Sequence, residues 1–150
     1  MQKIMFNDAF CLTQAVLDGK KKITRRITSG MIRQSPFAST GWEYVHSGKT
    51  FKPKYKVGEV VAIAESYKNV MSEKQFGEVW AIGNDITKEM AGYNNKMFVK
   101  ADLMPHQIKI TNIRIERLQD ISDEDCLLEG IRKGKVGNEN HWMDAYYTHK

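Results

Sequence analysis

The sequence predicts an α+β domain built on a small β-barrel flanked by short helices. Three observations lead to this fold class: an early helical segment stopped by a glycine, several short runs with strand character, and a second helical segment opened by a serine and three acids. The chain has 150 residues, of which 41% are hydrophobic and 27% charged. That length and composition are typical of one globular domain over residues 1–150.

The first helix is expected over residues 8–18. Asn7 or Asp8 can cap it, and Gly19 is a typical C-terminal stop because glycine readily adopts the left-handed conformation. The segment ITRRI, residues 23–27, then alternates with period two and predicts a short strand. The joint between helix and strand, GKKKITRR at 19–26, holds five cations and one threonine.

Two long connections are expected, over residues 28–56 and 69–96. The first sustains no hydrophobic period and interleaves aromatic residues with cations, which favours a functional loop over a disordered one. Its aromatic side chains can stack on bases and its lysines can neutralise phosphates. The alternative is that two of the aromatics cover the edge of the barrel. The residues concerned are Trp42, Tyr44, Lys49, Lys52 and Lys54.

Three further segments have strand character. EVVAIAES, residues 59–66, is a near-continuous apolar run that predicts a strand buried on both faces and closing at Glu65. MFVKAD, residues 97–102, predicts another. QIKITNIRIERL, residues 107–118, changes the parity of its isoleucines at Thr111–Asn112, so it forms either one strand with a bulge or two strands separated by a turn.

A second helix is expected after Ser122. Serine is a favourable N-cap, and the acids at 123–125 suit the positive end of the helix dipole. Gly130 is expected to end this helix.

Charge is distributed unevenly along the chain. Residues 1–58 hold eleven Lys and Arg against three Asp and Glu, whereas the remainder holds twelve against fifteen. A basic excess concentrated in this way favours a polyanionic partner, with nucleic acid first and a phosphorylated small molecule second. A well-solvated basic surface is the alternative.

The remaining composition points to no disulfide, metal, cofactor or membrane partner. Cys11 and Cys126 lie far apart without a CxxC motif, which predicts buried thiols. No apolar stretch is long enough for a membrane span, and the N-terminus lacks the apolar core of a signal peptide, so a cytoplasmic location is expected. The histidines show no metal-ligand spacing; they are His46, His106, His141 and His149.

Three blocks of the sequence resemble the ASCH domain family of the PUA-like superfamily. They are GKKKITRR at 19–26, YKVGEVVAIAES at 55–66 and ITNIRIERLQDISDEDCLLEGI at 110–131. The blocks cover about a third of the residues. The third is similar to a subgroup found in phages and prophages, whose members run VRVERLQDISEEDALAEGI.

The resemblance implies a PUA-like β-barrel with a cleft lined by the basic joint and by the end of the acid-capped helix. It implies binding of RNA or a modified nucleotide. Some compact relatives are amidohydrolases that remove an acyl group from the exocyclic nitrogen of a modified cytidine with a lysine, a threonine and a glutamate. Those catalytic residues fall here on Lys21, Thr24 and Glu129. The long loops of this chain, and the absence of a clear final helix, set it apart from those relatives.

The residues themselves give this chemistry a basis. A threonine becomes a nucleophile when a base takes its proton, and a lysine can serve as that base when its pKa falls toward neutrality. The cations beside Lys21 disfavour its ammonium form. In a regular strand, however, Lys21 and Thr24 have opposite parity, so they converge only if the chain turns between them. Solvated lysines after a helix and an ordinary strand threonine are the alternative interpretation.

Arg25 shares the parity of the isoleucines and therefore needs a carboxylate partner such as Glu65 or Glu129, unless it reaches solvent past the barrel rim. Together with the joint and the first loop, this gives a predicted binding set. Its members are Lys20, Lys22, Arg25, Arg26, Trp42, Tyr44, Lys52, Lys54 and Glu65.

Three functions follow. The first is a PUA-like module that binds RNA or a modified nucleotide at the basic joint. The second is an enzyme using Lys21, Thr24 and Glu129, either an N-acylcytidine amidohydrolase or a ribonuclease. The third is a phage or prophage accessory interaction domain with no nucleic-acid role.

Overall fold

A computed structural model describes residues 1–26, 31–37, 41–51, 53–130, 132–136 and 139–143. These residues divide into two compact units, each of which is described by itself. The first unit comprises residues 1–8 and 60–109, and the second comprises residues 9–59 and 110–150. The prediction of one domain over 1–150 stays a prediction.

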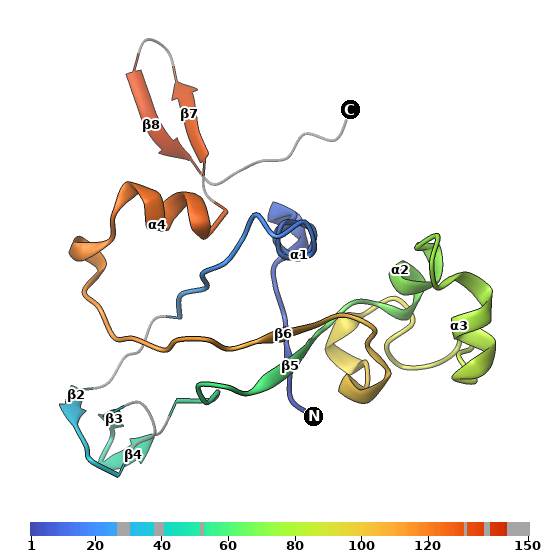
Figure 1. Ribbon diagram of the computed structural model, residues 1–150, viewed down its shortest axis with the longest axis horizontal. Coiled ribbons are helices and arrows are strands. Elements are labelled where there is room, and N and C mark those ends of the chain that lie inside the picture. The colour runs from blue at the N-terminus through green and yellow to red at the C-terminus, as the bar shows by residue number, and fades with distance from the viewer. Residues whose placement is uncertain (27–30, 38–40, 52, 131, 137–138, 144–150) are drawn as a thin grey trace. The chain divides into compact units, whose positions relative to one another are not determined.

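The first unit contains a three-stranded sheet. Its strands are β1 (Lys3–Ile4), β5 (Val60–Ile63) and β6 (Gln107–Lys109), in the order β1-β5-β6. β5 pairs in parallel with β1 and antiparallel with β6, which runs beside it in Figure 1. Val61, Ala62 and Ala64 are fully buried. This confirms the expectation of a buried strand within residues 59–66.

Two helices follow β5, α2 (Tyr67–Ser72) and α3 (Gly77–Gly83). Ser66 caps α2 by accepting a hydrogen bond from the Asn69 N–H at 3.2 Å. The two helices supply much of the core of this unit, in which Tyr67 packs against Trp80. The predicted long loop over 69–96 is therefore wrong. Each helix has only six or seven residues, which is too short to show a helical period in the sequence.

The strand predicted over 97–102 is also wrong. This segment forms two 3₁₀ turns, η2 (Lys96–Phe98) and η3 (Ala101–Leu103). Asn95 opens η2 by accepting a hydrogen bond from the Met97 N–H at 2.9 Å. The Lys100 N–H is bonded to the Tyr67 hydroxyl instead of a neighbouring strand. Local capping and a side-chain acceptor thus take the donors that a sheet would have needed.

The second unit begins with a shorter helix than the one predicted over 8–18. A 3₁₀ turn, η1 (Asp8–Phe10), is followed at Cys11 by a positive φ of 51° and then by α1 (Leu12–Leu17). Gly19 has φ +69° and donates its N–H to the Val16 carbonyl oxygen, which confirms it as the helix stop.

Residues 20–26 form no regular secondary structure, so the strand predicted over 23–27 is wrong in its described part, 23–26; Ile27 lies outside the described residues. The physical reason is that Lys22 and Ile23 both donate their N–H groups to the Leu128 carbonyl oxygen, at 2.8 and 3.1 Å. The end of a helix, and not a neighbouring strand, accepts these bonds.

A three-stranded antiparallel meander lies within the region predicted as a loop over 28–56. It consists of β2 (Met31–Gln34), β3 (Trp42–His46) and β4 (Lys49–Phe51) (Figure 1). Ser47 and Gly48 connect β3 to β4 with φ values of 50° and 72°, which is the signature of a two-residue hairpin turn. The loop prediction is therefore wrong. The Ser47-Gly48 pair is a hairpin signal, because this turn requires positive φ values, which glycine adopts readily.

The last elements of the second unit follow an extended segment. β6 ends at Lys109, and residues 110–117 lie outside any strand, so neither prediction for 107–118 holds beyond Lys109. After η4 (Leu118–Asp120), Ser122 caps α4 (Asp123–Leu128) by accepting the Asp125 N–H at 3.1 Å. Gly130 follows with φ +94°, as predicted. β7 (Arg132–Val136) and β8 (Glu139–Met143) then form an antiparallel pair.

The structure is α+β, but the predicted β-barrel is wrong. The described strands form open sheets of three, three and two strands, and none of them closes on itself within the described residues. Two of the strands that the barrel required, at 23–27 and 97–102, are absent from the described residues, and the third is cut to three residues. A barrel needs an unbroken circle of paired strands, which these elements cannot supply.

Two other predictions can be compared with the structure. Cys11 and Cys126 form no disulfide among the described residues, and both are half-buried instead of fully buried as expected. Among the described residues, every helix is too short or too polar to cross a lipid bilayer.

Gly92 generates a prediction for the core of the first unit. It has φ +102°, and a Cβ atom there would lie 3.0 Å from Tyr67 Cε2 and 3.2 Å from Val99 Cα. Gly58 has φ +86° with nothing within 4 Å. We expect Gly58→Ala to cost about 1–2 kcal/mol of unfolding free energy from backbone strain alone. Gly92→Ala should cost about 1–3 kcal/mol more from overpacking. Urea unfolding of the two variants checks this, and equal losses would contradict the packing argument.

Candidate functional site

The basic joint, residues 20–26, is held against the C-terminal end of α4. Besides the two N–H groups bonded to Leu128, the Lys20 and Lys21 N–H groups both donate to the Ala15 carbonyl oxygen in α1. Leu12 of α1 lies so close to Gly130 that a Cβ atom on this glycine would sit 3.3 Å from Leu12 Cδ2. The joint is thus fixed by helix ends on both sides.

Lys21 is the buried cation of the joint. Its side chain is 2% exposed, and Nζ donates a hydrogen bond to the Glu129 carbonyl oxygen at 2.6 Å. The same Nζ lies 4.0 Å from Glu129 Oε1. Burial lowers the pKa of Lys21 to about 8; the Glu129 carboxylate opposes this shift, whereas Arg26 and Arg25 add to it.

Arg25 is surrounded by three carboxylates. Its Nη1 donates to Glu129 Oε2 at 2.8 Å, its Nη2 to Asp125 Oδ2 at 2.9 Å and its Nε to Glu116 Oε1 at 2.7 Å. Its backbone N–H also donates to Glu129 Oε1 at 2.9 Å. A guanidinium that uses all three of its nitrogens in this way fixes both its own position and that of its partners.

Arg114 adds a second arginine to this cluster. It contacts Glu116 Oε2 through Nε at 3.0 Å and donates to Asp125 through Nη2. The cluster therefore contains the cations Lys21, Arg25 and Arg114 and the carboxylates Glu116, Asp125 and Glu129. The positive and negative charges are equal in number, so the cluster neutralises itself when all six groups are ionised.

The other side chains of the joint are exposed. Lys22, Thr24 and Arg26 alternate with Lys21, Ile23 and Arg25, which are buried or half-buried. Arg26 donates to Thr24 Oγ1 at 3.3 Å and to the Arg25 carbonyl oxygen at 2.9 Å. Lys20 is exposed as well and pairs with Asp18 at 2.7 Å. The joint therefore presents cations and one hydroxyl to solvent from a fixed backbone.

The structure brings two of the three predicted catalytic residues together. Lys21 and Glu129 are in contact, whereas Thr24 is exposed and is hydrogen-bonded to Arg26. Within the described part of the chain, Thr24 makes no hydrogen bond to Lys21 or Glu129. Glu129 is instead engaged mainly by Arg25.

The remaining predicted binding residues are scattered. Trp42 is half-buried in β3, and Lys54 is exposed with Nζ 5.3 Å from the centre of the Tyr55 ring. Lys52 and the side chain of Tyr44 lie outside the described residues.

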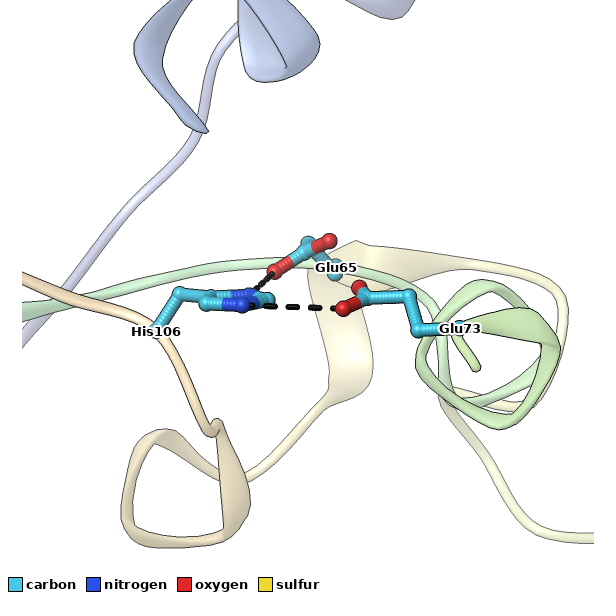
Figure 2. Close-up of side chains that lie close together, drawn as sticks. All are labelled: Glu65, Glu73 and His106. Carbon is cyan, nitrogen blue, oxygen red and sulfur yellow. Dashed lines mark hydrogen bonds and ion pairs between the residues drawn. The ribbon is translucent and has the colours of Figure 1, made fainter. Parts of the chain in front are cut away.

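Glu65 has a partner within its own unit. It belongs to the first unit, where its Oε1 lies 2.8 Å from His106 Nδ1 (Figure 2). Burial raises the pKa of Glu65, and its hydrogen bond with His106 opposes that shift. Of the two carboxylates named for Arg25 from the sequence, Glu129 is therefore the partner.

Sequence reasoning missed the other partners in both clusters. The sequence pattern predicts Asp125 only as an acid at the start of a helix, and it predicts Arg114 and Glu116 only as strand residues. Glu73 and His106 carried no sequence signal, because their proximity to Glu65 depends on how α2 and β6 follow β5. The alternation of charges in RIER at 114–117 was the one usable indication of an ion-pair network.

No protein-family model, no curated protein and no solved structure matches this chain at a significant level.

Removing the Arg25 side chain should destabilise the second unit. In Arg25→Ala, three carboxylates lose their central cation, and we expect a loss of about 3 kcal/mol of unfolding free energy. Arg33 is a matched control, because its guanidinium forms one ion pair with Glu43 and its side chain is 57% exposed. Arg33→Ala should cost at most about 1 kcal/mol. Urea unfolding measures both, and similar losses would contradict a central role for Arg25.

Lys21 should make stability rise with alkaline pH. The amine releases its proton near pH 8 in the folded protein, but only near its ordinary pKa of 10.5 in the unfolded chain. Between these values the unfolded state binds more protons, so the free energy of unfolding increases with pH, by about 3 kcal/mol in total. Lys21→Met lacks this contribution. The difference between the wild-type and variant stability curves, from urea unfolding at pH 7–10.5, should rise accordingly; a constant difference would contradict the lowered pKa.

Proposed function

We propose that this chain binds single-stranded RNA or a modified nucleotide through the exposed side chains of the basic joint. The observation that carries the proposal is the alternation along residues 20–26. Lys21 and Arg25 are committed to carboxylate partners, whereas Lys22, Thr24 and Arg26 face solvent. The resemblance of three sequence blocks to the ASCH family supports the same class of ligand.

An ammonium, a hydroxyl and a guanidinium at every second residue suit a chain of phosphates. Phosphate contacts in nucleic-acid complexes come from lysine, arginine and hydroxyl side chains, and they fix the ligand without reading its sequence. Because the backbone of the joint is bonded to α1 and α4, these groups are already positioned before a ligand arrives. Preorganisation of this kind reduces the entropy cost of binding.

The paired cations have a different part in this proposal. Arg25 is saturated by carboxylates and Lys21 is buried against Glu129, so neither contributes a free charge to a phosphate. Their effect is to hold the joint in place. The cations of the joint thus fall into two groups. Lys21 and Arg25 hold the backbone of the joint in place, and Lys22 and Arg26 would contact the ligand.

A second candidate activity is supported by the surroundings of Lys21. A buried amine with a pKa of about 8, 4.0 Å from a carboxylate, has the properties of a general base. In an amidohydrolase acting on acylated cytidine, Thr24 would have to turn from its exposed position toward Lys21 to give up its proton, and Glu129 would hold the amine. Arg26, which donates to Thr24 Oγ1, would stabilise the developing alkoxide.

RNA binding is tested by a charge-matched pair of double variants. Fluorescence anisotropy with a labelled single-stranded RNA should show a loss of about tenfold or more in affinity for Lys22→Ala with Arg26→Ala. The slope of log affinity against log salt should become shallower by about 1.4, which is about 0.7 for each lost phosphate contact. Lys74→Ala with Lys88→Ala removes the same charge from exposed positions of the first unit and should leave affinity nearly unchanged.

Equal losses in the two double variants would show non-specific attraction to the net charge and would overturn the proposed site. The same proteins, incubated with cytidine acylated at its exocyclic nitrogen, distinguish the second candidate. Hydrolysis that Thr24→Ala abolishes while nucleoside affinity persists would establish catalysis. Binding without product would leave the chain as a binding module.

A further inference from the structure

A second cluster of ionisable side chains lies in the first unit, outside the basic joint. It consists of Glu65, Glu73 and His106 (Figure 2). One candidate ligand atom from each residue can be chosen so that all three atoms lie within 4.8 Å of one another. The imidazole lies between the two carboxylates, with Nδ1 2.8 Å from Glu65 Oε1 and Nε2 3.6 Å from Glu73 Oε2.

The fold brings these residues together from three elements. Glu65 lies two residues beyond the end of β5, and Glu73 is the C-terminal cap of α2. His106 directly precedes β6, and its carbonyl oxygen accepts the Ile63 N–H at 2.9 Å, which extends the β5–β6 pairing. The cluster therefore follows from the antiparallel register of β5 and β6 and from the six-residue length of α2.

The cluster is largely shielded from water and rigidly supported. The Glu65 side chain is 5% exposed, and those of His106 and Glu73 are 22% and 26% exposed. The Phe76 ring meets the imidazole edge-on with ring centres 5.5 Å apart. The Glu65 N–H is bonded to Met104 Sδ at 3.4 Å. These contacts hold the imidazole ring and the Glu65 backbone in place.

The charges in the cluster do not balance when the imidazole is neutral. A neutral imidazole carries one N–H, so it can donate to only one of the two carboxylates. Its other nitrogen then turns a lone pair toward a carboxyl group, which is unfavourable unless a cation lies between them or that carboxyl is protonated. The two carboxylates also interact with each other. Within the described part of the chain, neither of them contacts a lysine or an arginine.

We propose that Glu65, Glu73 and His106 form a binding site for one divalent transition-metal ion, with Zn²⁺ as the best match. The imidazole nitrogen is a borderline ligand that favours Zn²⁺ over Mg²⁺ and Ca²⁺, which prefer oxygen alone, and carboxylate oxygens also ligate Zn²⁺. In a tetrahedral zinc site with bonds of about 2.1 Å, the ligand atoms lie about 3.4 Å apart. Binding would therefore require the glutamate side chains to rotate until the three ligand atoms reach that spacing.

The number of ligands gives this site its chemical character. Three protein ligands leave a fourth position of a tetrahedral ion open to water, as in catalytic zinc sites and unlike closed structural ones. Part of the cluster is accessible, since Glu73 and His106 are each about one-quarter exposed. The site is independent of the basic joint, because all its residues belong to the first unit and none of the proposed RNA contacts does.

The test uses the full chain, stripped with EDTA and titrated with ZnCl₂ in competition with a chromogenic chelator. We expect one Zn²⁺ to bind and to raise the melting temperature of the wild-type protein. Glu73→Gln and His106→Gln should each weaken zinc binding about tenfold or more, since even residues that only support metal ligands contribute 10–100-fold. His46→Gln removes an exposed histidine of β3 in the other unit and should bind zinc like the wild type.

Circular dichroism of the metal-free variants shows whether they fold, and Co²⁺ provides a measurement that needs no variant. Co²⁺ added to the wild-type protein should give the intense visible absorption of a four-coordinate ion, and one equivalent of Zn²⁺ should abolish it. Absence of stoichiometric binding would overturn the proposal and leave the three side chains as a hydrogen-bonded structural cluster. Equal zinc affinity in the wild type and both ligand variants would overturn it as well.

Discussion

The second unit depends on one interaction, the binding of the Arg25 guanidinium to Glu116, Asp125 and Glu129. These partners lie 91–104 residues from Arg25 in sequence, so the ion pairs tie the segment after α1 to the segment around α4. Desolvating a charged group costs several kcal/mol unless its hydrogen bonds are made, and here every guanidinium nitrogen has a carboxylate partner. The contacts specify one arrangement of the joint because a displaced carboxylate would leave a charge without a partner.

The same network determines which cations of the joint are available to a ligand. The sequence alone does not distinguish the five cations of the joint. In the structure, Arg25 is paired with three carboxylates and Lys21 is buried against Glu129. The lowered pKa of Lys21 is a consequence of that burial, since Glu129 acts in the opposite direction. An anion at the exposed side chains therefore meets a segment whose backbone conformation is set by buried charge pairs. In the proposed binding mode, ligand contact and stability are separable, because different residues would carry them.

Local signals in the sequence predicted local structure, and the errors arose where pairing depends on distant residues. The correct predictions rest on signals from neighbouring residues. Ser122 and Gly130 mark the two ends of α4, Gly19 ends α1, and the apolar run around Val61 is a buried strand. The predicted strand at 23–27 was wrong because the Leu128 carbonyl oxygen, 105 residues from Ile23, accepts the N–H groups of Lys22 and Ile23. The barrel prediction was wrong for the same reason, because the barrel required this strand. The parity of Arg25 predicted a carboxylate partner, with Glu65 and Glu129 as the two candidates and a solvent-exposed guanidinium as the alternative. Neither the choice of Glu129 nor the presence of Glu116 and Asp125 could be made without the fold.

The two ionisable clusters solve the problem of buried charge in opposite ways. Around Arg25, three carboxylates face two arginines and the ammonium of Lys21, and the charges balance without any ligand when all six groups are ionised. Around His106, two carboxylates face a single imidazole whose charge depends on a second proton. The cluster around Arg25 needs no metal ion, because its positive and negative charges are already equal in number. In the cluster around His106 the carboxyl groups outnumber the basic groups, and in the proposed site a divalent ion bound by both carboxylates and a ring nitrogen would supply the missing positive charge.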